Sequence, residues 1–207
     1  MSAEEAREAR ARAAVMYPWL AVPLGLVTTV EAKWAGDRCC VCDSDVDYDD
    51  DQLVACSACS MTVHQRCYGI TQLPDAEQVW LCDPCKFPAP EGKPAAQCCL
   101  CPVTGGALKE ASIKGLWVHC VCAQWIPGMG FENPETLSPI CGVEYVERER
   151  WRSRCCICKE SMGAKINCQH CILALHPLCA RMAGLTMELQ ETGNAQQPFR
   201  HIVKCYK

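Results

Sequence analysis

The chain has 207 residues, of which 21 are cysteine but only three are phenylalanine and five tyrosine, so its apolar core is thin for its length. Such a chain needs cross-links, either disulfides in an oxidising compartment or metal thiolates in a reducing one. Its net charge of −4 disfavours non-specific binding to a nucleic-acid duplex and favours a basic peptide as partner.

Residues 1–36 are expected to form a poorly ordered leader with a short helix at residues 3–14. Residues 13–30 are mostly apolar, which could suggest a signal or membrane segment. Pro18, Pro23 and Gly25 interrupt this run, and the mixed charges before it lack the positive excess of a signal peptide. A targeting role is the alternative, and no membrane partner is expected.

From residue 37 onward the cysteines occur in C-x2-C pairs, accompanied by H-x2-C pairs. Zinc sites use this spacing, whereas disulfide frameworks have no reason to produce it. In the first finger, residues 37–87, only four residues separate Cys59 from His64, so wrapping both pairs around one ion would need a very tight loop. Two interleaved sites are therefore expected. The first comprises Cys39, Cys42, His64 and Cys67, and the second comprises Cys56, Cys59, Cys82 and Cys85.

The string C-x2-C-x4-H-x2-C occurs at both 56–67 and 168–179, so the chain contains an internal repeat. A proline-containing linker at residues 88–97 leads to a zinc knuckle with its connector at residues 98–150. A second finger follows at residues 151–207. The expected ligands are Cys98, Cys101, His119 and Cys122 in the knuckle, Cys155, Cys158, His176 and Cys179 in the second finger, and Cys168, Cys171 and Cys205 in a last set of that finger.

The last set has three evident ligands, because the partner of Cys205 would stand at position 208, so this finger looks truncated at its last ligand. His201 could complete the set or be an ordinary loop histidine, and His170 is expected to be a solvated spacer. The four complete sets leave no open position for a reactive water, so the sites are structural and neither catalysis nor a small-molecule substrate is expected. Five zinc ions on sixteen thiolates would bring the net charge to roughly −10.

Five cysteines lie outside the ligand spacing. In the doubled positions the x2 register favours the first cysteine of each pair as the ligand. The remaining thiols are expected to be small buried or half-buried side chains, with redox sensing as the alternative. They are Cys40, Cys99, Cys120, Cys141 and Cys156.

Little regular structure is expected. Residues 53–55 and 62–63 are short strand candidates beside the metal pairs, and one or two helical turns are expected at residues 177–184. The fold class is thus a set of small zinc-stabilised folds, irregular, with short antiparallel strands and short helices. The sites form tandem cross-brace fingers joined by a zinc knuckle.

The ligand order of the first finger, with Trp80 two residues before Cys82, resembles a plant homeodomain (PHD) finger more than a RING-type ubiquitin ligase domain. The whole series, residues 31–207, resembles the PHD, zinc-knuckle, extended-PHD cassette of chromatin regulators, and within it the PHD region of trithorax-type histone-lysine methyltransferases of plants and algae. The matching strings are VHQRCYG at 63–69, CLCPVTGGALK at 99–109, GLWVHCVCAQWIPG at 115–128, LCARMAGLTMEL at 178–189 and AKWAGDRCCVC at 32–42. No catalytic SET domain is present in this sequence, so we expect a nuclear chromatin reader rather than an enzyme.

The resemblance implies that the first finger takes the histone H3 N-terminal tail as an added strand. Leu53, Val54 and Ala55 would supply the strand edge, and carbonyls within Pro74, Asp75 and Glu77 would catch the free amine of the tail. Aspartates before the strand can meet arginine or lysine by charge-assisted hydrogen bonds, although a merely solvated loop is the alternative. These are Asp43, Asp45, Asp47, Asp49, Asp50 and Asp51.

Methylation preference follows from the scarcity of aromatic rings, because readers of trimethyl-lysine enclose the cation in such rings. Tyr48 is the only ring expected near the site. Family readers of methylated lysine often carry Trp two residues before the ligand His, where this chain has Thr62. The sequence therefore favours unmethylated lysine.

Two further features are ambiguous. Trp117 and Trp125 flank the second ligand pair of the knuckle and are expected to pack rather than bind. Arginines around Trp151 could contact nucleosomal DNA or form a solvated connector; they are Arg148, Arg150, Arg152 and Arg154. The rival functions are a ubiquitin ligase, a fragment of a larger histone-lysine methyltransferase, and a scaffold for other chromatin proteins.

Overall fold

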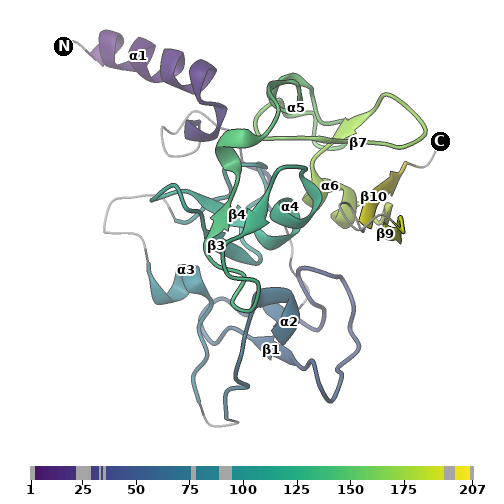
Figure 1. Cartoon of the computed structure of the whole chain (residues 1–207). Coiled ribbons are helices and arrows are strands. Elements are labelled where there is room, and N and C mark those ends of the chain that lie inside the picture. The colour runs from purple at the N-terminus through teal and green to yellow at the C-terminus, as the bar shows by residue number, and fades with distance from the viewer. Residues whose placement is uncertain are drawn as a thin grey trace.

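The computed structural model describes residues 3–21, 29–32, 34, 36–75, 78–88, 95–193 and 199–205. Figure 1 shows the first finger below, the knuckle in the middle and the second finger at the upper right. Within the described residues the strands form five two-stranded antiparallel sheets, so the predicted fold class is confirmed. None of the described helices is both long and apolar enough to cross a membrane.

The same local structure occurs three times. In each unit a short strand leads to a ligand histidine. This histidine has an extended backbone and is the N-cap of a short helix, and the ligand cysteine follows three residues later. One helical turn brings such residues to the same side, which explains the H-x2-C spacing. The second cysteine of each doubled pair donates its backbone N–H to the residue two before the histidine: Cys40 to Thr62, Cys99 to Trp117 and Cys156 to Ala174.

The first finger contains both of its predicted strands. β1 pairs with β2 in the register Leu53 to His64, and α2 continues directly from β2. Its last helix, α3, packs on strand β3 of the knuckle. The elements are β1 (Leu53–Ala55), β2 (Thr62–His64), α2 (Gln65–Tyr68) and α3 (Asp83–Lys86).

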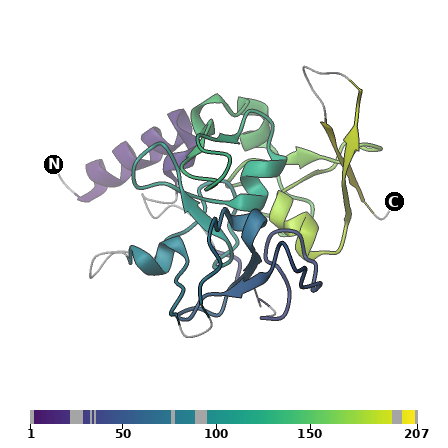
Figure 2. The same cartoon turned by 60° about the horizontal axis from the view of Figure 1, so that its bottom comes forward.

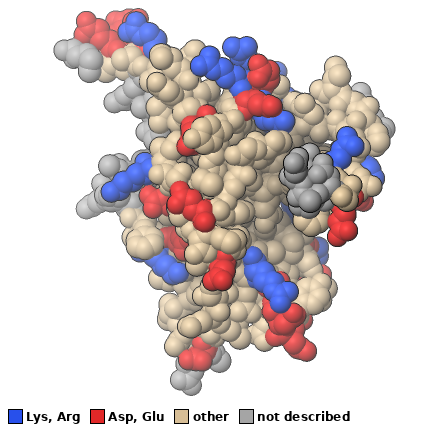
Figure 3. All heavy atoms as spheres, viewed as in Figure 1, with Lys and Arg blue, Asp and Glu red and all other residues tan. Residues whose placement is uncertain are grey.

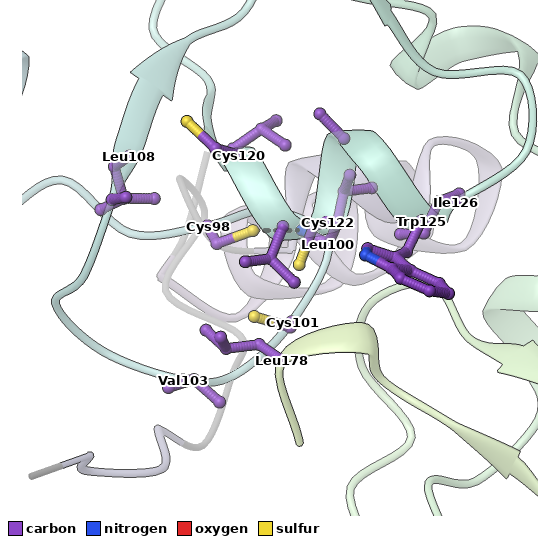
Figure 4. Packing of buried hydrophobic residues seen from close by; sticks show 14 of the residues in the cluster. Cys98, Leu100, Cys101, Val103, Leu108, Cys120, Cys122, Trp125, Ile126 and Leu178 are labelled. Atoms are coloured by element: carbon purple, nitrogen blue, oxygen red, sulfur yellow. Dashed lines mark hydrogen bonds between the residues drawn. The ribbon is translucent and has the colours of Figure 1, made fainter. Parts of the chain in front are cut away.

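The knuckle lies at the centre of the molecule and carries much of its apolar core. Leu100, Val118 and Ile140 are fully buried, and Figure 4 shows Leu178 of the second finger beside Cys101 and Val103. The predicted packing role of Trp125 is confirmed, since it is 5% exposed. The elements are β3 (Leu108–Glu110), β4 (Trp117–His119), α4 (Cys120–Trp125), β5 (Gly130–Phe131), β6 (Ile140–Cys141) and a 3-10 helix at Val143–Tyr145.

The second finger contains the predicted helix after His176 and a hairpin that the sequence pattern did not predict. Its strands pair from Thr186 with Lys204 to Glu191 with Phe199, and Figure 2 shows the hairpin reaching away from the body. The buried Lys165 ammonium donates to three carbonyls at 2.7–3.1 Å, and burial lowers its pKa to about 8. The elements are α5 (Arg148–Arg152), β7 (Ile166–Asn167), β8 (Ala174–Leu175), α6 (Pro177–Met182), β9 (Thr186–Glu191) and β10 (Phe199–Lys204).

The leader is partly built into the fold. The predicted helix is present as α1 (Ala3–Met16), followed by a 3-10 helix at Pro18–Leu20, and the Trp19 ring lies 6.1 Å from that of Trp151. Val30 donates its N–H to Pro102 at 2.8 Å, and the Trp34 indole donates to the Thr104 carbonyl at 3.1 Å. These hydrogen bonds and the aromatic packing attach the described residues of the leader to the knuckle and α5.

Candidate metal centres and peptide-binding edge

The structure brings together the five predicted ligand sets. Within each set the candidate ligand atoms lie within 4.8 Å of one another, and the thiol and imidazole donors, four in each complete set, suit tetrahedral zinc. The interleaved pairing of the first finger is present as expected. The complete sets are Cys39, Cys42, His64 and Cys67; Cys56, Cys59, Cys82 and Cys85; Cys98, Cys101, His119 and Cys122; and Cys155, Cys158, His176 and Cys179.

Each ligand histidine is oriented by a backbone carbonyl. The Nε2 atoms of His64, His119 and His176 donate to the carbonyls of Val46, Gly105 and Met162 at 2.8, 2.6 and 2.7 Å. The proton is thereby held on Nε2, and Nδ1 faces the thiols, 3.2 Å from the sulfur of Cys42 in the first finger. The hydrogen bond from Nε2 to the carbonyl therefore fixes the tautomer in which Nδ1 can bind zinc.

One cysteine in each Cys3His set is placed to be a thiolate. Hydrogen bonds from the thiols of Cys42 and Cys67 hold the pKa of Cys39 well below its usual value. In the second finger the hydrogen bond from Cys179 lowers the pKa of Cys155 to about 2, against the effect of burial. The sulfur of Cys39 also accepts the backbone N–H of His64 at 3.4 Å. These donors stabilise the charged form that a metal ion requires.

The fifth set contains Cys168, Cys171 and Cys205. The Cys205 sulfur lies 3.5 Å from the sulfur of each of the other two. His201 does not join it, since its ring packs on that of Trp125 with centroids 5.0 Å apart. His201 lies within β10 and Cys205 follows its last residue, so the extended strand between them keeps the imidazole away from the three cysteines. The alternative of His201 as fourth ligand is therefore wrong, whereas His170 is exposed as expected.

The five extra cysteines have the predicted burial. Cys40, Cys99 and Cys120 are buried, while Cys141 and Cys156 are half-buried. Burial raises the pKa of Cys40 and of Cys120 to about 12. These two thiols are thus protonated and unreactive at neutral pH.

The outer edge of β1 is open to an added strand. The Cys56 N–H donates to the Met61 carbonyl at 2.8 Å, and the Gln65 N–H donates to the Gln52 carbonyl at 3.1 Å. Because hydrogen-bonded pairs alternate along an antiparallel ladder, the backbone groups of Val54 also face β2. The backbone groups of Leu53 and Ala55 then point outward. Ala55 is exposed, and among the described residues its outward groups have no partner. Val54, which is buried, cannot offer its backbone to a peptide.

The acidic loop is largely engaged with the chain itself. Asp43 and Asp45 both pair with Arg38, at 3.2 and 3.3 Å. The Asp50 carboxylate pairs with Arg66 at 2.8 Å, and charged groups of both signs lie together over this loop (Figure 3). Asp47 and Asp51 accept the backbone N–H groups of Leu53 and Arg66, each at 2.8 Å.

Asp43 moreover faces the second finger. It lines a cavity of about 340 Å³ between the two fingers, together with Arg181 and Met187 of the second. These partners could not be foreseen, since a sequence shows the number of aspartates but not the groups that they contact, and the histone contacts of the loop stay a prediction. Asp49 is exposed and has no partner among the described residues.

Two other parts of the predicted peptide site can be located. Pro74 is half-buried and Asp75 exposed, on the loop between α2 and α3, while Glu77 lies outside the described residues. Tyr48 is 48% exposed, with its ring 5.7 Å from the imidazole of His64. Thr62 is buried and its hydroxyl donates to the Gly36 carbonyl at 2.6 Å, so it supplies no wall to an aromatic cage around a methylated lysine.

The arginines around the buried Trp151 differ in their freedom. Arg150 pairs with Glu147 at 3.1 Å and donates to the Lys165 carbonyl, and Arg154 donates to the Lys159 carbonyl. Arg148 and Arg152 are exposed on α5, where basic side chains gather at the top of Figure 3.

Comparisons with known proteins agree with this architecture. The PHD-zinc-finger like domain family matches residues 96–207, more than half of the chain, and the PHD-finger family matches residues 50–86. The crystal structure of the zebrafish PHF14 PZP module is similar, with a TM-score of 0.63 and 31% identity, covering 82% of this chain and 86% of that one.

Two similar curated proteins come from plants. The chain is 43% identical over 165 residues to histone-lysine N-methyltransferase TRX1 of Oryza sativa subsp. japonica. It is 44% identical over 184 residues to histone H3-lysine(4) N-trimethyltransferase ATX1 of Arabidopsis thaliana. These matches cover 78% and 85% of this chain but 16% and 17% of the relatives. Because a PHD-zinc-finger model matches more than half of the chain and these relatives are more than 40% identical over most of it, the chain belongs to the PHD-type zinc-finger family of chromatin regulators.

Proposed function

We propose that this chain is a zinc-dependent reader that binds the N-terminal tail of histone H3 along β1, and that it contributes to transcription regulation in the nucleus. The observation that carries the proposal is the open outer edge of β1, where Ala55 presents unpaired backbone groups next to the zinc ligand Cys56. Backbone pairing of this kind gives affinity. The name of the Arabidopsis relative, which refers to lysine 4 of histone H3, supports the choice of tail.

Selectivity for unmethylated lysine is part of the proposal. Tyr48 is the one Phe, Tyr or Trp in the acidic loop, residues 43–51, and a single exposed ring encloses a trimethylammonium group poorly. Asp49 offers a free carboxylate, which prefers an ammonium that can still donate hydrogen bonds. A role within a larger histone-lysine methyltransferase is compatible with this reading function, and other chromatin proteins are further partners of such a module.

The wild-type chain should bind an unmethylated H3 tail peptide more tightly than the trimethylated form, and Ala55→Pro should weaken both. Proline removes the outward N–H of Ala55 while the β1–β2 hydrogen bonds, made by neighbouring residues, remain. The affinity should fall about tenfold or more, equivalent to about 1.4 kcal/mol. Isothermal titration with both peptides measures it.

Ala55→Val is the matched control, because it keeps the N–H and suits a strand. Its affinity should stay near that of the wild type. Tighter binding of the trimethylated peptide would reject the methylation preference, and undiminished binding by Ala55→Pro with zinc retained would reject the strand edge.

We also propose a weaker, secondary contact between α5 and nucleosomal DNA, because Arg148 and Arg152 are exposed on one short helix. Their joint replacement by glutamate should lower nucleosome affinity. The slope of log affinity against log salt should become shallower by roughly 0.9 for each phosphate that the arginines had neutralised. Lys114→Glu, on the exposed turn of the knuckle, is the control; equal behaviour of the two variants would exclude this contact.

A further inference from the structure

We infer that Lys109 of the knuckle positions the loop of the first finger that catches the free amine of the tail, so that the knuckle is part of the reading site; this inference rests on the proposed function. Lys109 lies on β3 and is 4% exposed. Its position is unusual, because a buried ammonium is costly unless it is paired. The groups that pair with it all belong to the first finger.

Lys109 holds two groups at once. Its ammonium lies 3.0 Å from the Asp83 carboxylate at the start of α3 and 4.2 Å from the centre of the Tyr68 ring at the end of α2. The Tyr68 hydroxyl donates to the Leu108 carbonyl at 2.7 Å and accepts the Asp83 N–H at 3.0 Å. An ion pair, a cation–π contact and one hydrogen bond thereby join the knuckle to the finger, and the Tyr68 hydroxyl also ties Asp83 to this junction from within the finger.

The amine-catching loop begins and ends at this cluster. It leaves the helix directly after Tyr68 and returns at Trp80, whose ring meets that of Tyr68 edge-on with centroids 5.8 Å apart. The Trp80 carbonyl then accepts the Ser57 N–H at 2.9 Å, next to the end of β1. A shift of Tyr68 therefore moves both ends of the loop relative to the strand edge.

The described part of the loop borders a cavity of about 220 Å³. Ile70, Gln72 and Trp80 of the loop line this cavity together with Asp83 and Lys109. The Lys109 ammonium therefore lies both in the cluster at the ends of the loop and on the wall of the cavity next to it.

The test compares H3 tail peptides with a free and an acetylated amino terminus. Wild type should prefer the free amine, and Lys109→Met should reduce this preference about tenfold, which corresponds to about 1.4 kcal/mol. Reduced stability alone would weaken both peptides together and leave their ratio unchanged. Lys109→Arg, which can still pair with Asp83 and stack on Tyr68, should retain most of the preference.

Tyr68→Phe provides a second variant in case Lys109→Met does not fold, because it keeps the ring and removes the hydroxyl that links Leu108 to Asp83. It should reduce the preference in the same direction. An unchanged ratio in folded, zinc-loaded Lys109→Met or Tyr68→Phe would overturn the inference while leaving the proposed function intact. Absence of tail binding by the wild type would instead overturn the proposed function itself.

Discussion

Cys101→Ser is expected to unfold all three units of the chain rather than the knuckle alone. Cys101 is fully buried, and the apolar core around its site also receives Leu178 from the second finger (Figure 4). A structural zinc ion contributes about 10–16 kcal/mol of folding free energy in zinc-finger peptides. That is comparable to the whole stability of a small domain, about 5–15 kcal/mol, so little else can hold the core when this site is broken.

Native mass spectrometry and thermal unfolding at fixed free zinc measure the result. Cys101→Ser should lose zinc from more than one site and should lack a cooperative transition. Cys171→Ser is the matched control, since it makes the same change in the set of three cysteines at the periphery. It should lose one ion at most and keep its transition. Similar melting curves for the two variants would contradict a central knuckle.

Ligand grouping could be predicted from the sequence because tetrahedral zinc imposes short, recognisable spacings. The tight loop between Cys59 and His64 was enough to predict interleaving, and the structure has that pairing. Strands β1 and β2 and helix α6 were predicted beside the ligands for the same reason. The metal geometry dictates the local backbone there.

Contacts between distant segments could not be predicted in this way. Tyr68 and Leu108 are 40 residues apart, and no spacing rule connects them. The acidic loop shows the same limit, because Arg38 and Arg66 neutralise aspartates that a sequence count treats as free. The hairpin of β9 and β10 was missed because most of its side chains are exposed, which leaves no clear alternation of apolar and polar residues.

Gly163→Ala is expected to destabilise the chain by about 3 kcal/mol or more, which is a large effect for the addition of a single methyl group. Gly163 has a φ of +76°, and an added Cβ would stand 2.3 Å from the Leu100 carbonyl oxygen and 2.9 Å from the Cys101 nitrogen. Those backbone atoms cannot retreat easily, since the same carbonyl accepts the Ala164 N–H at 2.9 Å. The substitution therefore forces the second finger away from a zinc ligand of the knuckle.

Gly115→Ala separates this close approach from the cost of the backbone conformation. Gly115 has a similar φ of +82°, but its Cβ would meet nothing within 4 Å, so its substitution should cost only the left-handed penalty of roughly 1–2 kcal/mol. Thermal unfolding of both variants at the same free zinc concentration gives the comparison. Equal destabilisation would mean that the two units do not approach as closely as the structure shows. Greater destabilisation at Gly163 would show that the second finger is held to the knuckle by its backbone, beside Cys101, as well as by the side chains of α6.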